Sequence, residues 1–129
     1  MHEASIANAI LQSATSKLMA TKDAAQLTLI RVEIGEFSNV DSESLQFAFD
    51  NMRALYQGAA ECELQIDEVR AKAICQKENH QYHPDFEHAF CCQTCGSGIG
   101  KLLCGEELNI VSLRIETQLA EGAKQCTTR

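Results

Sequence analysis

The cysteines of this 129-residue chain are concentrated in one short segment. Four of the seven, together with three of the four histidines, lie between Cys75 and Cys95. An odd number of cysteines argues against a disulfide framework, and a cluster of thiols and imidazoles is typical of a metal site or of reactive thiols. Hydrophobic periodicity also disappears between Cys75 and Gly100. We therefore interpret this segment as a metal-binding insert.

Charge and hydropathy exclude several classes of protein. The 11 Lys+Arg residues face 18 Asp+Glu residues, and the resulting net charge of -7 argues against nucleic-acid binding. No apolar run approaches the ~20 residues of a membrane span, and the N-terminal segment lacks the pattern of a signal peptide. We expect one cytoplasmic domain without nucleic-acid or membrane partners, whose acidic surface suits docking to other proteins.

Two segments show the three- and four-residue apolar spacing of amphipathic helices. The first runs from about Ser5 to Ala20. The second follows Asp41, whose carboxylate can accept the free N–H groups of a helix, and ends at Gly58. The apolar stripes are Ile6, Ala7, Ile10, Leu11, Ala14 and Leu18 in the first, and Leu45, Ala48, Phe49, Met52 and Leu55 in the second.

Three further segments alternate as β-strands do. Residues 28–34 alternate up to Gly35, and residues 62–66 form a second strand that can extend towards Ile74. Residues 108–116 form a third, in which two apolar sets are out of phase by one residue, as a bulge or two-sided burial produces. The predicted order is helix, strand, helix, strand, metal-binding insert, strand. Inside the second strand, Cys62 is expected to behave as a small apolar core residue.

The segment from Cys92 to Gly98 has the sequence of a metal knuckle. Two thiolates two residues apart, here Cys92 and Cys95, can bind one tetrahedral ion, and Gly96 permits the turn that follows. Zinc suits such ligands. A thioredoxin-like redox pair is the alternative, but such pairs lie between a strand and a helix, and nothing after Cys95 has a helical pattern.

The upstream half of this site is irregular, although a closed structural site needs four ligands. Cys75 opens it, but Glu78 stands where a second thiolate would complete a knuckle. A glutamate oxygen can bind zinc, although His80 matches a thiolate-rich site better. The favoured ligands are Cys75, His80, Cys92 and Cys95, with Glu78, His83 and Cys91 as weaker alternatives. Each histidine could equally be a solvated loop residue, and Cys104 and Cys126 have no assigned role.

The N-terminus offers a different kind of site. In Met1-His2-Glu3 the α-amine, the amide nitrogen of the second residue and the His2 imidazole can form adjoining chelate rings around one ion. Nitrogen donors in a plane are preferred by Ni(II) and Cu(II). The alternative is an ordinary frayed terminus.

These features together resemble the HypA family, the nickel-insertion accessory proteins of nickel–iron hydrogenase maturation. The resemblance covers about residues 1–117 and rests on five ordered blocks. They are Met1-His2-Glu3, the run Ile34–Asp41 with its continuation Ser44–Phe49, Gly58–Ile66, Cys92–Ser97 and Gly105–Ile110.

The resemblance implies an α/β (α+β) fold, with two helices packed on a three-stranded sheet and a small zinc-binding module inserted before the last strand. Residues 1–74 and 105–117 would form the nickel-binding domain, residues 75–104 the zinc-binding insert and residues 118–129 a flexible tail.

It also implies two metals. Transported nickel would bind to Met1, His2 and Glu3. Structural zinc would bind to two Cys-x-x-Cys pairs, of which this chain keeps Cys92 and Cys95 but departs from the family at Glu78. His80 falls where the family often has a histidine after the first cysteine, and is retained as the substitute.

The function implied is a nickel metallochaperone that delivers Ni(II) for hydrogenase maturation, with a HypB-type GTPase and a hydrogenase large-subunit precursor as partners and a homodimer as a further option. An enzyme is not expected, because no nucleophile, base and orienting group stand at motif-like spacing. One rival is a zinc-ribbon interaction module with no nickel role. Another is a thiol redox or iron–sulfur protein that uses Cys91, Cys92 and Cys95.

Overall fold

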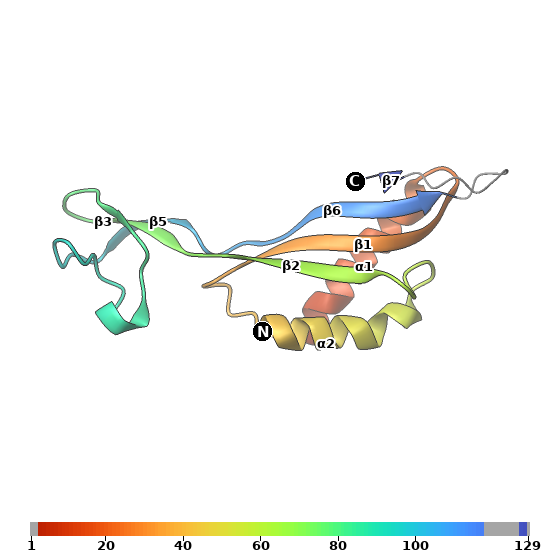
Figure 1. Cartoon of the computed structure of the whole chain (residues 1–129), viewed down its shortest axis with the longest axis horizontal. Helices are drawn as coiled ribbons and strands as arrows, with labels where there is room; N and C mark the ends of the chain where they lie inside the picture. Colours follow the sequence, from red (N-terminus) through yellow and green to blue (C-terminus); the bar gives the residue numbers. More distant parts are fainter. Residues whose placement is uncertain (1–2, 118–126, 129) are drawn as a thin grey trace. The chain divides into compact units, whose positions relative to one another are not determined.

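The computed structural model describes residues 3–117 and 127–128, which fall into two compact units (Figure 1). Of these residues, the first unit holds 3–32, 40–67, 109–117 and 127–128, and the second holds 33–39 and 68–108. The second unit extends beyond the predicted insert of residues 75–104. Among the described residues, no helix is long and apolar enough to cross a membrane.

The first unit combines two helices with the longer sheet. Its helices are α1 (Glu3–Ala20) and α2 (Ser42–Met52), which pack against each other, and α1 passes behind the strands in Figure 1. The strand order is β2-β1-β6-β7. The strands are β1 (Ala24–Gly35), β2 (Glu63–Val69), β6 (Leu108–Thr117) and the short β7 (Thr127–Thr128). The predicted fold of two helices and three strands is confirmed, with β7 as an addition.

The predicted apolar stripe of α1 is buried completely, whereas that of α2 is buried only in part, since Ala48 and Met52 are half-buried and Leu55 is 78% exposed. All six residues of the first stripe are buried in α1, and Leu45 and Phe49 are buried in α2. The predicted cap is also confirmed, since the Asp41 carboxylate accepts the N–H of Ser44 at 3.1 Å. The second helix is shorter than predicted, because a 3₁₀ turn (Arg53–Leu55) follows Met52 before the chain reaches Gly58.

Cys62 lies in the core of this unit, as expected. It is fully buried, and burial raises the pKa of its thiol to about 12. A thiol with so high a pKa stays protonated and behaves as an apolar side chain. The predicted tail from residue 118 lies mostly outside the described residues, but β7 pairs antiparallel with Ile115 and Glu116.

The second unit has its own sheet, which the sequence pattern did not predict. Its strands are β3 (Lys72–Cys75), β4 (Gln81–Tyr82) and β5 (Ile99–Cys104), in the order β4-β3-β5 with antiparallel pairing. Figure 1 labels β3 and β5. The second predicted strand therefore stops at Val69, and β3 is separate. Its small core consists of Ala73, Cys75, Tyr82 and Cys92, packed against Cys95, Ile99 and Leu102.

At one end of this unit three chain segments pass unusually close together. The Gly35 position has no room for a side chain, since a Cβ there would lie 2.2 Å from the backbone of Gly105. Next to it, Glu36 N–H donates to Val69 O at 2.9 Å, and Phe37 N–H donates to Gly105 O at 2.6 Å. The sequence Gly35-Glu36-Phe37 thus joins the segments that lead into β3 and out of β5.

Candidate metal centre

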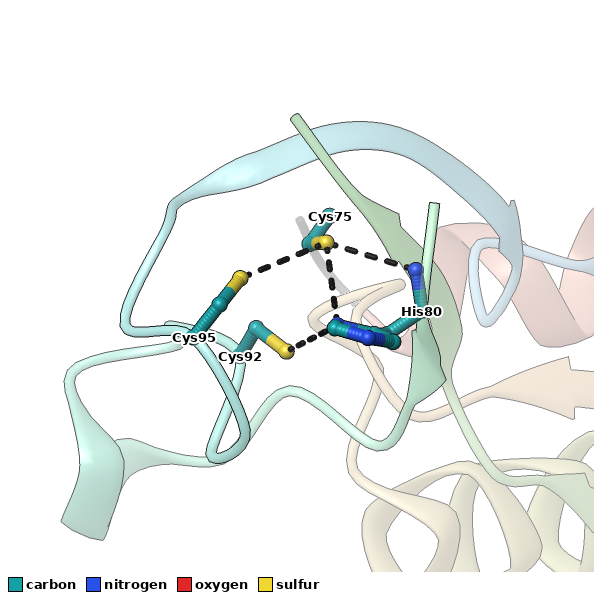
Figure 2. Close-up of side chains that lie close together, drawn as sticks. All are labelled: Cys75, His80, Cys92 and Cys95. Atoms are coloured by element: carbon teal, nitrogen blue, oxygen red, sulfur yellow. Dashed lines mark hydrogen bonds between the residues drawn. The ribbon is translucent and has the colours of Figure 1, made fainter. Parts of the chain in front are cut away.

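Four side chains of the second unit point toward one another (Figure 2). Cys75, His80, Cys92 and Cys95 each offer one ligand atom, and these atoms all lie within 4.8 Å of one another. The Sγ atoms of Cys75 and Cys95 are 3.6 Å apart, and His80 Nδ1 lies 3.7 Å from Cys75 Sγ and 3.6 Å from Cys92 Sγ. The structure therefore brings together the four residues that spacing and ligand chemistry favoured.

The first turn of the site runs from Cys75, the last residue of β3, to His80. Cys75 N–H donates to His80 O at 3.0 Å, and Asn79 adopts a left-handed conformation with φ +56°. The N–H groups of Glu78 and His80 donate to Cys75 Sγ at 3.4 and 3.3 Å. The backbone of this turn thus surrounds one sulfur with donors.

The second turn, from Cys92 to Ser97, repeats this backbone pattern. Cys92 N–H donates to Ser97 O at 2.8 Å, and the fifth residue, Gly96, is again left-handed with φ +76°. The Ser97 Oγ lies 3.2 Å from Cys95 Sγ. Each turn is therefore closed by a bond between its first and sixth residues.

Hydrogen bonds to two of the sulfurs, those of Cys75 and Cys95, favour their thiolate forms. The hydroxyl and backbone N–H of Ser97 lower the pKa of the Cys95 thiol to about 7. Burial raises the pKa of Cys75, but the N–H groups of Glu78 and His80 outweigh it and leave the pKa below its ordinary value. Thiolates are the forms that bind metal ions.

Three thiolates and one imidazole form a donor set typical of structural zinc. The two turns supply two ligands each, and the ligands are buried or half-buried. The redox alternative finds less support, because Cys92 and Cys95 lie in a turn that leads into the strand β5 rather than into a helix.

Two of the weaker ligand candidates, His83 and Cys91, contact residues outside the four-residue cluster. His83 Nε2 lies 2.8 Å from Glu36 Oε1, and its Nδ1 lies 3.2 Å from an Arg70 nitrogen. Cys91 Sγ faces the carbonyl of Ala89 at 3.5 Å. These groups are held by neighbours outside the four-residue cluster.

Glu78 has a different relation to the site, which sequence reasoning missed. Its Oε1 lies 3.6 Å from His80 Nε2, the ring nitrogen opposite the one that faces the sulfurs. One feature of the sequence pointed to this contact. The two turns have the same length, and Glu78 stands at the position of the first turn that Cys95 occupies in the second.

At the other predicted site, the structure describes only the last of three residues. Met1 and His2 lie outside the described residues. Glu3 begins α1, and its carboxylate accepts the N–H of Asp41 at 3.0 Å, which is the main reason why its pKa is lowered. This bond joins the start of α1 to the start of α2 within the first unit.

Comparison with known proteins identifies one family. Residues 1–115 match the family model described as "Hydrogenase/urease nickel incorporation, metallochaperone, hypA". The hydrogenase maturation factor HypA of Chlorobium phaeobacteroides (strain BS1) is 34% identical over 116 residues, which cover 90% of this chain and 100% of that protein. The guanidine hydrolase-activating protein A of Synechocystis sp. is 30% identical over 112 residues, with coverages of 85% and 91%.

The fold recurs in a solved structure. The solution structure of the Ni metallochaperone HypA from Helicobacter pylori matches with a TM-score of 0.62 and 23% sequence identity. The match covers 89% of this chain and 97% of that one. The two proteins share their fold over nearly their whole lengths.

Proposed function

Because this chain belongs to the HypA family, we propose that it is a nickel metallochaperone that binds Ni(II) at its N-terminus and delivers it to an enzyme precursor. The observation that carries this proposal is the family match over residues 1–115, which includes the Met1-His2-Glu3 start and the cysteine-rich unit in one chain. In this proposal the protein carries nickel and does not catalyse a reaction. Its expected place is the cytoplasm.

The nickel ligands proposed are the α-amine of Met1, the amide nitrogen and imidazole of His2, and Glu3. The proposed site includes the first residue of α1, Glu3, whose carboxylate accepts the N–H of Asp41. A terminal site with few ligands suits transfer, because a carrier must also release its ion. The amine and imidazole must be deprotonated to bind, so nickel affinity should weaken as pH falls through about 8 to 6.5.

Zinc is the proposed resident metal of the second unit, held by Cys75, His80, Cys92 and Cys95. The ion would clamp the two turns together and so fix β3, β4 and β5 around a small core. The support for this is the donor set and the short separations among the four ligand atoms.

The proposed partners are a HypB-type GTPase and, as recipient, a hydrogenase large-subunit precursor. Most evidence for the recipient comes from relatives named hydrogenase maturation factor, such as that of Chlorobium phaeobacteroides. The guanidine hydrolase-activating relative favours a second candidate recipient, a guanidine hydrolase. Transfer of nickel from the loaded chain to each purified recipient separates the two.

The first test is nickel titration of untagged protein by calorimetry, with zinc content measured in parallel. Wild type should bind one Ni(II) tightly, and His2→Ala should lose this binding while its circular dichroism stays unchanged. His88→Ala is the matched control, because His88 lies in the second unit and contacts Asp85 at 2.7 Å.

Two outcomes would contradict the proposal. Equal nickel affinity in wild type and His2→Ala would rule out the terminal site. A wild type that holds zinc but takes up no nickel would instead favour a zinc-ribbon interaction module.

A further inference from the structure

The two turns of the cysteine-rich unit share a backbone pattern but differ in their fourth and sixth residues. In the second turn the fourth residue, Cys95, belongs to the metal-ligand cluster, and the sixth, Ser97, places its Oγ 3.2 Å from the Cys95 sulfur. In the first turn the sixth residue, His80, belongs to the cluster, and the fourth is Glu78. The fourth and sixth side chains are neighbours in both turns.

The two nitrogens of the His80 ring face different groups. Nδ1 lies within 3.7 Å of two cysteine sulfurs, whereas Nε2 lies 3.6 Å from the Glu78 carboxylate (Figure 2 shows the ring and the sulfurs). A neutral imidazole carries one proton, and only the nitrogen without it can bind a metal. A carboxylate beside Nε2 stabilises the proton on that nitrogen, which leaves the Nδ1 lone pair free to face the sulfurs.

We propose that Glu78 is a positioning residue of the zinc site, which holds His80 in the tautomer and orientation that bind zinc through Nδ1. The inference rests on the zinc site proposed above and deepens it. In the second turn the fourth residue is the ligand and the sixth lies beside it. In the first turn the sixth residue is the ligand and the fourth supports it. The Glu78 side chain is 63% exposed, as suits a group that supports a ligand from the outside.

The expected effect is moderate. Removal of a carboxylate that supports a metal-bound histidine costs about 10–100-fold in metal affinity. Here the contact is longer than a hydrogen bond and exposed to solvent, so the lower end of this range applies. We therefore expect Glu78→Gln to weaken zinc binding about tenfold.

The experiment measures zinc affinity by competition with a chelator in wild type, Glu78→Gln and the control Glu87→Gln. Glu87 lies in the same unit, in the 3₁₀ turn Phe86–His88. Long-range ¹H–¹⁵N NMR of the zinc-loaded proteins reports which nitrogen of His80 is bound and which carries the proton. Wild type should show bound Nδ1 and protonated Nε2, and only Glu78→Gln should lose affinity.

A gain-of-ligand variant provides a second measurement. Glu78→Cys places a thiol where the second turn has Cys95, so zinc should become bound by four sulfurs and His80 should be released. X-ray absorption and the His80 NMR signals report this exchange directly.

Three results would overturn the inference. Unchanged zinc affinity in Glu78→Gln would remove the supporting role. A wild-type His80 bound through Nε2, or free while the Glu78 oxygen is bound, would reverse the assignment. Wild-type protein without zinc would overturn the zinc site itself, and nickel titration at the N-terminus would still test the metallochaperone role separately.

Discussion

The partly exposed carboxylate of Glu36 has two partners in the second unit. It accepts the N–H of Ala71 at 2.8 Å and lies 2.8 Å from His83 Nε2, so it joins two segments of the second unit. The Ala71 N–H is the main reason why the pKa of Glu36 is lowered, and His83 lowers it further, while burial opposes both. The charged form is therefore the form that this part of the fold stabilises.

Glu36→Gln should destabilise the second unit in a pH-dependent way. Because the folded pKa lies below the ordinary value of 4.5, the stabilisation is present above that pH and is lost as pH falls through the lowered folded pKa. We expect a loss of about 1 kcal/mol at neutral pH, small because the carboxylate is partly exposed.

Urea unfolding monitored by amide exchange in β3 and β5 provides the measurement. The difference from wild type should shrink as pH falls below 4.5. The exposed residue Glu106 gives the control, Glu106→Gln. A loss of stability that stays constant across this range would show that the charge of Glu36 is not its cause.

The sequence predicts the four candidate ligands better than it predicts the contact between Glu78 and His80. Cys92 and Cys95 stand at knuckle spacing, and a thiolate-rich site favours imidazole over carboxylate at the remaining position, so the candidates follow from ligand chemistry. The contact between Glu78 and His80 depends on how six residues turn in space. Spacing alone ranks Glu78 as a ligand candidate and cannot show that it faces Nε2.

Gly35, the last residue of β1, lies where two backbone segments approach closely, and this approach leaves no space for a side chain. A Cβ at this position would lie 2.2 Å from both the carbonyl carbon and the oxygen of Gly105, so the two segments would have to separate. Gly35→Ala should cost about 3 kcal/mol or more and should weaken zinc retention, because the displaced segments lead into β3 and out of β5. Thermal unfolding and zinc content measure both effects.

Gly98→Ala is the matched control, because no atom lies within 4 Å of a Cβ placed there. The free energy of unfolding of Gly98→Ala should lie within about 0.5–1 kcal/mol of the wild-type value, and the variant should retain its zinc. Equal stability of Gly35→Ala and Gly98→Ala would contradict the close approach at Gly35.

The long helices and strands can be predicted from the sequence, whereas the short strands cannot. α1 and α2 show several turns of apolar spacing, and β1 alternates over many residues, so the period identifies each of them. β4 has two residues and β5 contains Gly100 and Lys101 among its apolar residues, so neither shows a period that distinguishes a strand from a loop. These strands form because neighbouring turns hold them in register, which a local pattern does not contain.

At the scale of the whole molecule, the two units have cores of different kinds. The first unit buries many apolar side chains of α1, α2 and β1. The cluster in the second unit consists of Ala73, Cys75, Tyr82 and Cys92, and two of these four are proposed zinc ligands. A core of this size rarely supports a fold alone, so the second unit should depend on its metal.

Removal of zinc should therefore affect the two units unequally. Structural zinc contributes on the order of 10 kcal/mol in small zinc-dependent folds, far more than the cluster around Tyr82 can replace. Cys92→Ala should release the metal and expose the amides of residues 75–100 to hydrogen exchange, while the amides of α1 and α2 stay protected. The neighbouring thiol gives a close control, because Cys91→Ala leaves the four-residue cluster intact and should retain both zinc and protection. If exchange rose equally in α1 and in β3 of Cys92→Ala, the two units would share one folding transition, and the zinc ion would stabilise the first unit as well.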